Sequence, residues 1–513
     1  MSHKAKALMI LGTASDVGKS VIAAGLCRIF YRAGIRVAPF KAQNMSLNSY
    51  VTPDGREIGW AQAAQAIACG IEPTVDMNPV LLKPVSHLGS QVILQGKVYG
   101  NMGVRDYYAL KKKIWHKVKE SYLRLEREFS LIVLEGAGGA AEINLREHDI
   151  ANFRMAEFAD APVLLAGDIE RGGVFASLAG TLDLIRPRER SRVKGLIVNK
   201  FRGDPTLLKT GIEFLERRTG IPVLGVIPYY DGISIPEEDS VALERKIREQ
   251  RPFGPKTVNI AVIRLPHMAN YTDFAEVERE GRVVMRYLTK RERLSDVDVL
   301  ILPGTKNTLG DLEWLRHEGW REEISSYVTQ GGRVVGICGG YQILGEEVAD
   351  PLAVEGKREK GRGLGLLPLR TELAAEKTTE KVVARSLLNG VIPHVEGYEI
   401  HMGKSEPVKK VDPAFKILKR GSRSVRETDG AVVEGGRIWG SYLHGIFSNS
   451  SFRRAWLNDL FRAKGLPRPA LQQRRDPYDE WAGHLWKHLD MDRIFALVGS
   501  KKPKKYSWRG KGL

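Results

Sequence analysis

Short apolar runs alternate with helix-length amphipathic stretches over the first 235 residues. The apolar runs lie at residues 7–11, 37–40, 131–135, 162–168, 195–200 and 222–228. Between them, residues 20–33 and 204–219 carry apolar positions at the spacing of amphipathic helices. Continuous apolar strands separated by helices predict a parallel sheet that is covered on both faces. We therefore predict an α/β domain over residues 1–235.

A second α/β pattern follows a polar, charge-dense segment at residues 236–256, which we interpret as a linker with at least one helical turn. New apolar runs lie at residues 258–265, 298–305, 333–340 and 437–445. They predict a second α/β domain over residues 257–450. Within it, residues 355–381 are rich in charge, and we expect a surface excursion with few strands. Residues 451–513 predict C-terminal helices and a basic tail.

Composition favours a folded enzyme of the cytoplasm. The hydrophobic content of 43% and the charged content of 27% are ordinary for globular domains. Three cysteines without a CxxC pair exclude a disulfide scaffold and give no sign of a zinc site. No apolar run approaches the roughly 18 residues of a membrane helix. The apolar stretch near the N-terminus is typical of a buried strand, not of a signal peptide. We expect no membrane partner.

The chain is basic, with a formal net charge of +18. Six of these charges lie in residues 501–513, which contain no acidic residue. Basic tails can bind nucleic acid, and basic domains can equally bind an anionic substrate. We find no recognition helix, zinc finger or RNP-type aromatic motif, so we expect no nucleic-acid partner. A nucleic-acid-binding ATPase is thereby disfavoured.

A phosphate-binding loop is predicted where the first apolar run meets the first helix. The segment Gly12–Ser20 has the spacing Gly-x5-Gly-Lys-Ser, one residue longer than the common form. Backbone N–H groups at the start of a helix bind phosphate oxygens, and the lysine reaches the terminal phosphates. The serine hydroxyl would bind Mg²⁺. The expected nucleotide contacts in the loop are Gly12, Thr13, Asp16, Gly18, Lys19 and Ser20.

The expected nucleotide is ATP, with Mg²⁺ and no tightly bound protein cofactor. A guanine-reading Asn-Lys-x-Asp motif would follow a later strand, but here the fourth position is Arg202. Asn199 could still contact a purine. Glu135 and Asp168 end two predicted strands, where side chains of an open α/β sheet face the ligand. We predict Glu135, with Ser20, as the Mg²⁺ site, and leave Asp168 open between a ligand-facing and a structural role.

A nucleophilic cysteine is predicted in the second domain. Cys338 lies between an apolar run and a helix-like stretch, with glycines at 336, 339 and 340. Such a strand-to-helix turn exposes a nucleophile and directs the following N–H groups to a developing oxyanion. A helix N-terminus also lowers the pKa of a thiol. Cys27 and Cys69 lie in helical apolar patterns and are predicted core residues.

A base for this thiol is available in His444, which lies near the end of the last apolar run. Cysteine first and histidine about a hundred residues later resembles the order in class I glutamine amidotransferases. In those domains a Glu usually stands two residues after the histidine, but here that position is Ile446. The group that orients His444 is therefore left open. By the same resemblance, Gly304 of the segment PGT and Gly339 after the cysteine would donate to the oxyanion.

The two halves together resemble the cobyrinic and cobyric acid amidotransferase family, which joins a dethiobiotin-synthetase-like ATP-binding domain to a glutaminase domain without the HxE glutamate. The resemblance covers essentially the whole chain. The stretches that carry it include GTASDVGKS, KAQNMSLNSYVTPDGREIGWAQAAQA, LEGAGGAAEINL, GDIERGGVFASL, GICGGYQILG and EGYEIHMG. Members that amidate the a- and c-carboxylates usually read KGPDYID, where this chain has KAQNMSLN at 41–48. The segment favours the branch that acts on the remaining carboxylates.

The resemblance implies ATP- and glutamine-dependent amidation of the b, d, e and g carboxylates of adenosylcobyrinic acid a,c-diamide, in cobalamin biosynthesis. ATP would activate each carboxylate as an acyl phosphate, and the thiol would release ammonia from glutamine. Lys41, Gln43 and Asn44 would contact phosphate or carboxylate near the nucleotide. Ser46, Asn48 and Arg171 are weaker candidates for the same role.

Two alternatives remain beside this interpretation. Another amidotransferase of the same architecture could act on the a- and c-carboxylates or on a cell-wall lipid. A partition or scaffold ATPase of the deviant Walker type is a different class, but its signature lysine five residues before the loop lysine is Ala14 here. The order of amidation, the ammonia route, the oligomeric state and the role of the tail stay open.

Overall fold

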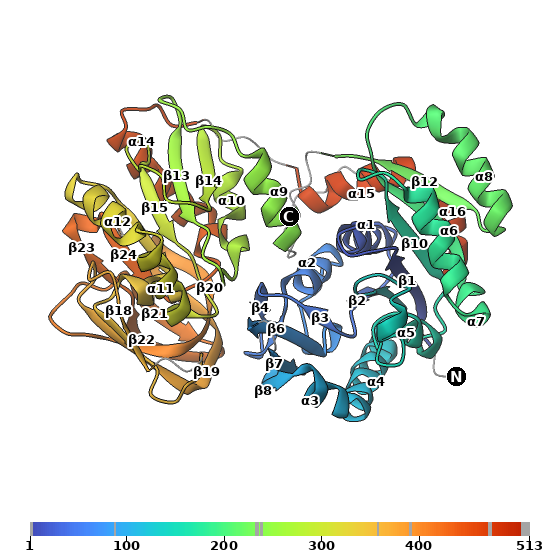
Figure 1. Cartoon of the computed structure of the whole chain (residues 1–513), viewed down its shortest axis with the longest axis horizontal. Helices are drawn as coiled ribbons and strands as arrows, with labels where there is room; N and C mark the ends of the chain where they lie inside the picture. The colour runs from blue at the N-terminus through green and yellow to red at the C-terminus, as the bar shows by residue number, and fades with distance from the viewer. Residues whose placement is uncertain are drawn as a thin grey trace.

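The computed structural model describes residues 4–86, 89–230, 235, 240–355, 359–388, 392–469 and 475–503. Two α/β lobes lie side by side, one built from the first half of the chain and the other from most of the second half (Figure 1). None of the helices in the described part combines the length and the apolar character that a membrane crossing requires. The predicted fold class, two successive α/β domains of which the first is built on a parallel sheet, is confirmed.

The N-terminal domain is built on a six-stranded parallel sheet in the order β12-β11-β10-β1-β9-β2. Every predicted apolar run of this half became one of its strands. They are β1 (Lys6–Gly12), β2 (Val37–Phe40), β9 (Leu131–Glu135), β10 (Val163–Asp168), β11 (Val193–Phe201) and β12 (Val223–Pro228). The covering helices include α1 (Lys19–Arg32), α2 (Trp60–Ala68), α4 (Lys111–Glu128), α5 (Phe153–Phe158), α6 (Val174–Leu184), α7 (Pro187–Arg190) and α8 (Lys209–Thr219).

Two small sheets that the apolar pattern did not predict extend this domain toward the other lobe. One contains β3 (Asn44–Met45), β6 (Val80–Ser86), β7 (Gly89–Leu94) and β8 (Lys97–Gly103), and it leads into α3 (Val104–Ala109). The other pairs β4 (Ser49–Val51) with β5 (Glu57–Gly59). Gln95 and Gly96 both have positive φ angles, 46° and 78°, which is the backbone of a type I′ turn and explains the tight β7–β8 hairpin.

The C-terminal domain contains a six-stranded sheet in the order β14-β13-β15-β16-β24-β23, in which only the pairing of β23 is antiparallel. The strands are β13 (Val258–Ile263), β14 (Val283–Leu288), β15 (Val299–Leu302), β16 (Val334–Ile337), β23 (Ala431–Val433) and β24 (Ile438–Ser441). Its helices include α9 (Ser240–Glu249), α10 (Ala275–Glu278), α11 (Thr308–His317), α12 (Trp320–Thr329) and α13 (Gly339–Leu344).

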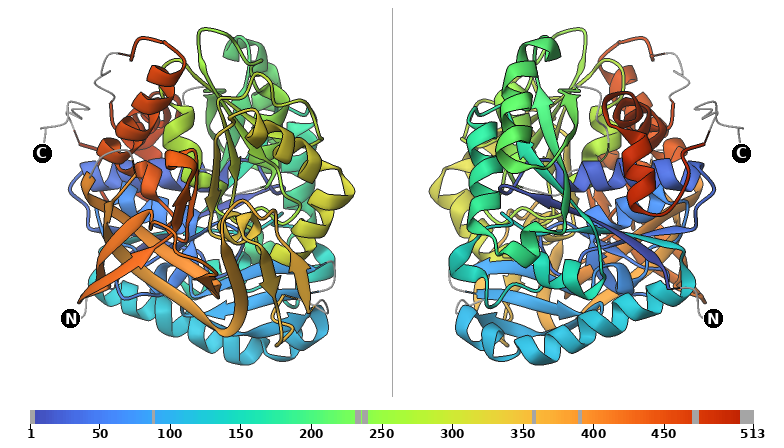
Figure 2. Two further views of the ribbon diagram at one scale, coloured as in Figure 1. Left: turned by 90° about the vertical axis from the view of Figure 1, so that its left-hand side faces the viewer. Right: turned by 90° about the vertical axis from the view of Figure 1, so that its right-hand side faces the viewer.

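The expectation of a strand-poor excursion over residues 355–381 was wrong. This segment contributes β18 (Lys360–Arg362) and much of the long strand β19 (Leu369–Ser386) to a further sheet (Figure 2). The sheet also contains β17 (Glu347–Ala349), β20 (Ile392–Pro407), β21 (Phe415–Arg420) and β22 (Arg423–Asp429). At the start of β19, buried Leu369 and Leu373 alternate with exposed charged residues, so the high charge density reflects a solvent-facing side, not a loop.

The C-terminal helices divide between the two lobes. Helix α14 (Ser450–Ala463) packs into the hydrophobic core of the C-terminal domain. Helices α15 (Pro477–His488) and α16 (Met491–Leu497) return to the N-terminal domain and pack against α1 (Figures 1 and 2). The Trp481 indole is buried there and donates to the Val21 carbonyl at 2.6 Å. The predicted basic tail falls mostly outside the described residues.

We predict that Trp481→Ala destabilises the N-terminal domain by about 3–5 kcal/mol, the usual cost of removing a large buried aromatic side chain. The expected result is a lower unfolding midpoint in thermal denaturation and weaker ATP binding at the same temperature. Leu207→Ala is a suitable control, because the Leu207 side chain is 78% exposed. An unchanged midpoint in Trp481→Ala would show that α15 adds nothing to the stability of this domain.

Candidate active sites

The predicted phosphate loop connects β1 to the first turn of α1. Gly18 precedes the helix with a φ of 94°, a conformation that residues with a Cβ rarely adopt. Gly12 and Thr13 anchor the loop to the sheet, because the Gly12 carbonyl accepts from Ala140 and the Thr13 N–H donates to Ala166. Lys19 donates to the carbonyls of Ala14 and Gly138 at 2.8 and 2.9 Å. The lysine is thereby held across the mouth of the loop.

The Glu135 carboxylate is the centre of a buried polar network beside this loop. It accepts hydrogen bonds from Ser20 Oγ at 2.7 Å, Lys41 Nζ at 2.7 Å and Gln65 Nε2 at 2.6 Å. Burial alone would raise the pKa of Glu135. The charge of Lys41 and the three hydrogen bonds outweigh burial, so the pKa of this carboxyl lies below its usual range. Glu135 is therefore ionised at neutral pH.

A cavity of about 1090 Å³ opens above the loop and this network. Its wall contains loop residues, the segment from Lys41 to Met45, and the turn after β9. The rest of the wall combines apolar, basic and acidic residues, among them Val104, Tyr108, Lys111, Arg146, Arg154, Glu142 and Asp149. The cavity is large enough for a nucleotide and part of a second ligand, since drug-sized ligands occupy roughly 300–1,000 Å³.

The cavity and its surroundings hold some of the other predicted residues. Gln43 and Asn44 line the cavity, and the side-chain amide oxygen Oε1 of Gln43 accepts from the Tyr107 hydroxyl at 2.5 Å. Ser46 and Asn48 are buried but do not line it. Asn199 donates to the Val17 carbonyl at 2.8 Å and so supports the loop from behind.

Asp168 and Arg171 lie apart from the cavity wall. Asp168 pairs with Lys200 at 2.9 Å and accepts from the Glu170 N–H, an arrangement that agrees with the structural interpretation of this residue. Lys200 also lies 3.6 Å from the Asp16 carboxylate. Arg171 is largely exposed, with its guanidinium 3.7 Å from Asp16.

The donor set beside the loop fits Mg²⁺. Ser20 Oγ and the Glu135 carboxylate are hard oxygen donors 2.7 Å apart, and the lowered pKa of Glu135 keeps the carboxylate charged. Mg²⁺ characteristically takes one or two protein carboxylates and completes its shell with phosphate oxygens and water. Ser20 and Glu135 would therefore hold the ion in company with a nucleotide.

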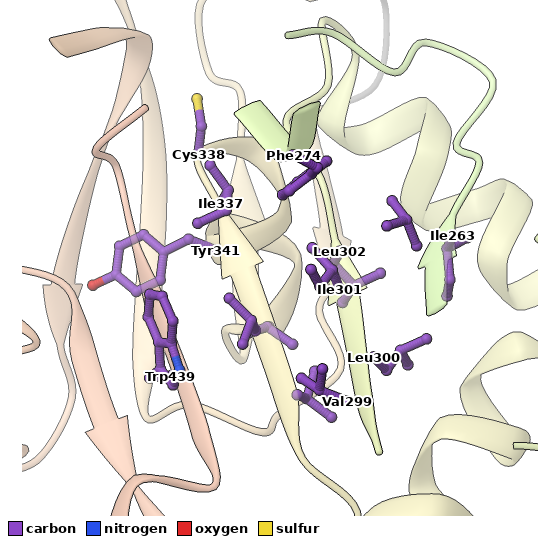
Figure 3. Close-up of a cluster of buried hydrophobic side chains, with 14 of the residues drawn as sticks. Ile263, Phe274, Val299, Leu300, Ile301, Leu302, Ile337, Cys338, Tyr341 and Trp439 are labelled. Carbon is purple, nitrogen blue, oxygen red and sulfur yellow. The ribbon is translucent and has the colours of Figure 1, made fainter. Parts of the chain in front are cut away.

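The second site is built around Cys338 at the junction of β16 and α13. Its φ of 52° and ψ of −109° are strained for a residue with a side chain, as in the turn that exposes a nucleophile. Figure 3 shows Cys338 above the core formed by β13, β15 and β16, with its sulfur directed away from that core. Gly340 makes the turn possible, because a Cβ there would lie 1.9 Å from the Leu302 carbonyl oxygen. Cys27 and Cys69 are buried core residues, as predicted.

Asp273 is the group that orients His444, and sequence reasoning missed it. Its carboxylate accepts from His444 Nδ1 at 2.6 Å and from the Gly445 N–H at 2.9 Å. Asp273 lies in the short helix η4 (Tyr271–Phe274), 171 residues before the histidine. No local signal marks it, since the segment after β13 contains several polar residues of similar character. Cysteine, histidine and aspartate therefore form a triad from three separate parts of the chain.

The electrostatics of this triad favour a charged pair. Burial lowers the pKa of His444, but the charge of Asp273 and the adjacent Cys338 thiol outweigh it and raise the pKa to about 10. At neutral pH His444 is therefore an imidazolium, placed beside the Cys338 sulfur. Gly304 adjoins both groups, because a Cβ at Gly304 would lie 3.2 Å from His444 Cε1 and 3.9 Å from Cys338 Cβ.

Comparison with known proteins matches each of the two domains to a family model. Residues 8–241 match the CobQ/CobB/MinD/ParA nucleotide binding domain, and residues 259–452 match the CobB/CobQ-like glutamine amidotransferase domain. The chain is 48% identical to the cobyric acid synthase of Syntrophobacter fumaroxidans, over 97% of this chain and 100% of that protein. The chain belongs to the cobyric acid synthase family. The Moorella thermoacetica member is 50% identical over 97% of this chain and 98% of its own length. As a member of this family, the chain is a glutamine-hydrolysing amidotransferase with a nucleotide-binding domain.

We predict that Asp273→Asn lowers the glutaminase kcat by about 10²–10⁴-fold, as loss of the orienting carboxylate does in other triads. An amide can hold the ring in the wrong tautomer and cannot stabilise the imidazolium. The rate of glutamine hydrolysis in wild type should fall as pH rises through about 10, where His444 loses its proton. In Asp273→Asn the pKa of His444 is no longer raised by this charge, so the fall should begin at lower pH.

Steady-state rates of glutamate release across pH test this prediction. Glu276→Gln provides a control, because Glu276 lies three residues from Asp273 but pairs with Arg279 and not with His444. A variant Asp273→Asn with wild-type kcat and an unchanged pH profile would mean that another group orients the histidine.

Proposed function

We propose that this chain uses MgATP and glutamine to amidate the b, d, e and g carboxylates of adenosylcobyrinic acid a,c-diamide. The observation that supports this most is the presence, in one chain of the cobyric acid synthase family, of an ATP-binding loop backed by Glu135 and a separate Cys338–His444–Asp273 triad. A carboxylate must be activated before an amine can displace its oxygen. Ammonia is mostly protonated at neutral pH, so it is best released where it is used. The dependence on ATP and glutamine favours a cytoplasmic setting.

The triad supplies the ammonia. Cys338, as the thiolate, attacks the carboxamide carbon of glutamine, and the resulting oxyanion lies between the backbone N–H groups of Gly304 and Gly339. The His444 imidazolium gives its proton to the departing ammonia and leaves a thioester on the cysteine. Water, deprotonated by the now neutral His444, hydrolyses the thioester to glutamate. Asp273 keeps the ring oriented through both steps.

The loop domain activates the carboxylate. Lys19 and the N–H groups at the start of α1 neutralise the phosphate charge, and Asp16 and Asn199 fix the loop around the nucleotide. Lys41 lies at 2.7 Å from Glu135 and within reach of the cavity, where it can bind the substrate carboxylate or the transferring phosphoryl group. Mg²⁺ held by Ser20 and Glu135 would offset the negative charge of the phosphates. Transfer of the γ-phosphoryl group from ATP to the carboxylate gives the acyl phosphate and ADP. Ammonia then attacks the acyl carbon, and inorganic phosphate and a proton leave to give the amide.

The cavity wall suits a large substrate with an apolar face and several carboxylates. Met45 and Val104 line it although they are 58% and 59% exposed, so apolar surface is available at the mouth. Lys111, Arg146 and Arg154 also line the cavity and can pair with substrate carboxylates, beside acidic residues such as Glu142 and Asp149. Burial lowers the pKa of Lys111 to about 8, which still leaves the amine mostly protonated at neutral pH. A corrinoid combines these features, because its peripheral carboxylates surround a flat macrocycle.

The decisive test is mass spectrometry of adenosylcobyrinic acid a,c-diamide incubated with the protein, MgATP and glutamine labelled with ¹⁵N in its amide group. Wild type should form four labelled amides. Cys338→Ser should form none from glutamine and should still amidate the corrinoid from ammonium chloride, since only the ammonia source is lost. Glutamine hydrolysis without amidation of this compound would reject the substrate, and activity of Cys338→Ser with glutamine would reject the nucleophile.

We predict that Glu135→Gln lowers amidation by at least about 100-fold with either nitrogen source, a loss typical of removing a charge that stabilises the transition state. An amide is a poor Mg²⁺ ligand, and Lys41 loses its partner. The Mg²⁺ concentration for half-maximal amidation should rise in the same variant. Glutamine hydrolysis without ATP should remain, because Glu135 lies in the other domain. Equal loss of both activities would point to misfolding, which circular dichroism would reveal.

A further inference from the structure

Ser49 lies at the point where the two domains meet, and both of its main-chain groups bind the glutaminase domain. Its N–H donates to Asn270 Oδ1 at 2.9 Å, and its carbonyl accepts from the Tyr398 hydroxyl at 3.2 Å. Ser49 is completely buried. A segment of the synthetase domain is thus fixed to the other lobe by two directional bonds in a site without water access, where such bonds cost most to break.

The two glutaminase partners of Ser49 are themselves attached to the triad. Tyr398 stacks on the His444 ring, with centroids 5.4 Å apart and planes inclined by 17°. Tyr398 and His444 also exchange backbone hydrogen bonds of 3.1 and 2.9 Å. Asn270 precedes the short helix that carries Asp273, and the Asp273 N–H donates to the Asn270 carbonyl at 3.0 Å. A single residue therefore connects Ser49 to each member of the pair: Tyr398 connects it to His444, and Asn270 connects it to Asp273.

On the synthetase side, Ser49 is connected to the wall of the nucleotide cavity. Its hydroxyl accepts from Lys83 Nζ at 2.7 Å. Lys83 belongs to β6, and its neighbours Leu82 and Pro84 line the cavity on the opposite side of that strand. The segment before Ser49 also begins in the cavity, since Asn44 and Met45 line it and pair with β6. A ligand that displaces this wall would move Lys83 and Ser49 with it.

A buried ionic group ties the same strand to the other domain. Glu57 of β5 lies 2.5 Å from both Lys83 and Lys377, and Lys377 belongs to β19 of the glutaminase domain. All three side chains are less than a tenth exposed. Separating one partner from such a group leaves an uncompensated buried charge, which costs several kcal/mol. A displacement of one of the three side chains is therefore expected to displace the other two. This rigidity is what a connection between two sites requires.

We propose that Ser49 is a positioning residue that couples the two active sites. A ligand in the synthetase cavity acts through β6 and Lys83 and fixes Ser49 against Tyr398 and Asn270. These two residues in turn align His444 with Asp273. Glutamine is then hydrolysed fastest when ATP and the acceptor carboxylate are in place. The inference rests on the proposed function, because it needs a synthetase ligand that reports to the glutaminase. The segment SLNSYV at residues 46–51 would thereby connect the two active sites.

The test compares glutamate release with and without MgATP plus adenosylcobyrinic acid a,c-diamide. Wild type should be stimulated by about tenfold or more, an ordinary size for coupling between sites. Ser49→Ala, which loses the bond from Lys83, and Tyr398→Phe, which loses only the bond to the Ser49 carbonyl, should show a stimulation of about twofold or less. Ammonium-dependent amidation by Ser49→Ala should stay near the wild-type rate, which a generally disturbed fold would not allow.

Glu72→Gln is the matched control, because Glu72 makes an exposed interdomain ion pair with Lys381 and does not touch Ser49. It should keep the full stimulation. Wild-type stimulation in both Ser49→Ala and Tyr398→Phe would overturn the proposal, as would a wild type that hydrolyses glutamine equally fast with and without the synthetase ligands. Failure of wild type to amidate the diamide from ammonium chloride would instead reject the proposed function, and the coupling with it.

Discussion

The register of two groups of parallel strands brings together residues that are far apart in the chain. In the first sheet Ile10 pairs with Glu135, so the carboxylate stands beside the loop that follows β1. In the second sheet Gly336 pairs with Leu302 on one side and with Gly440 on the other. Cys338, Gly304 and His444 all follow these strands within a few residues. Parallel strands end at one edge, and both reaction centres depend on that property.

Both centres also bury charge, and in each the charge is held by several partners. Glu135 accepts from Ser20, Lys41 and Gln65, and the pair of His444 and Asp273 is completed by the Gly445 N–H. Such groups add little to stability, because the loss of hydration offsets their attraction. What they provide is a fixed geometry before the substrate arrives. The surrounding aliphatic cores supply the stability that these networks do not.

The local features of the sites could be predicted from sequence, whereas their assembly could not. Cys338 and His444 each lie near the end of an apolar run, and Lys19 follows the first run after a short glycine-containing loop, so each residue can be recognised together with its strand. Asp273 contributes through tertiary packing alone, and a search near His444 for the usual acid finds Ile446 instead. The charged strand β19 was missed because its polar side faces solvent and an interdomain contact. The alternation of apolar and polar residues reveals a strand only where one face is buried. It gives little signal in a strand such as β19, where few of the alternating positions are apolar.

The return of α15 and α16 to the first domain has a consequence for the order in which the protein can be completed. The face of the first sheet that carries α1 gains part of its apolar covering from residues near the end of the chain. On the ribosome this covering is made only after the entire glutaminase domain. Until then α1 exposes the surface that later contacts Trp481 and Leu485. The core of the nucleotide-binding domain can therefore become complete only after the glutaminase domain, which lies between its two segments in the sequence, has been synthesised.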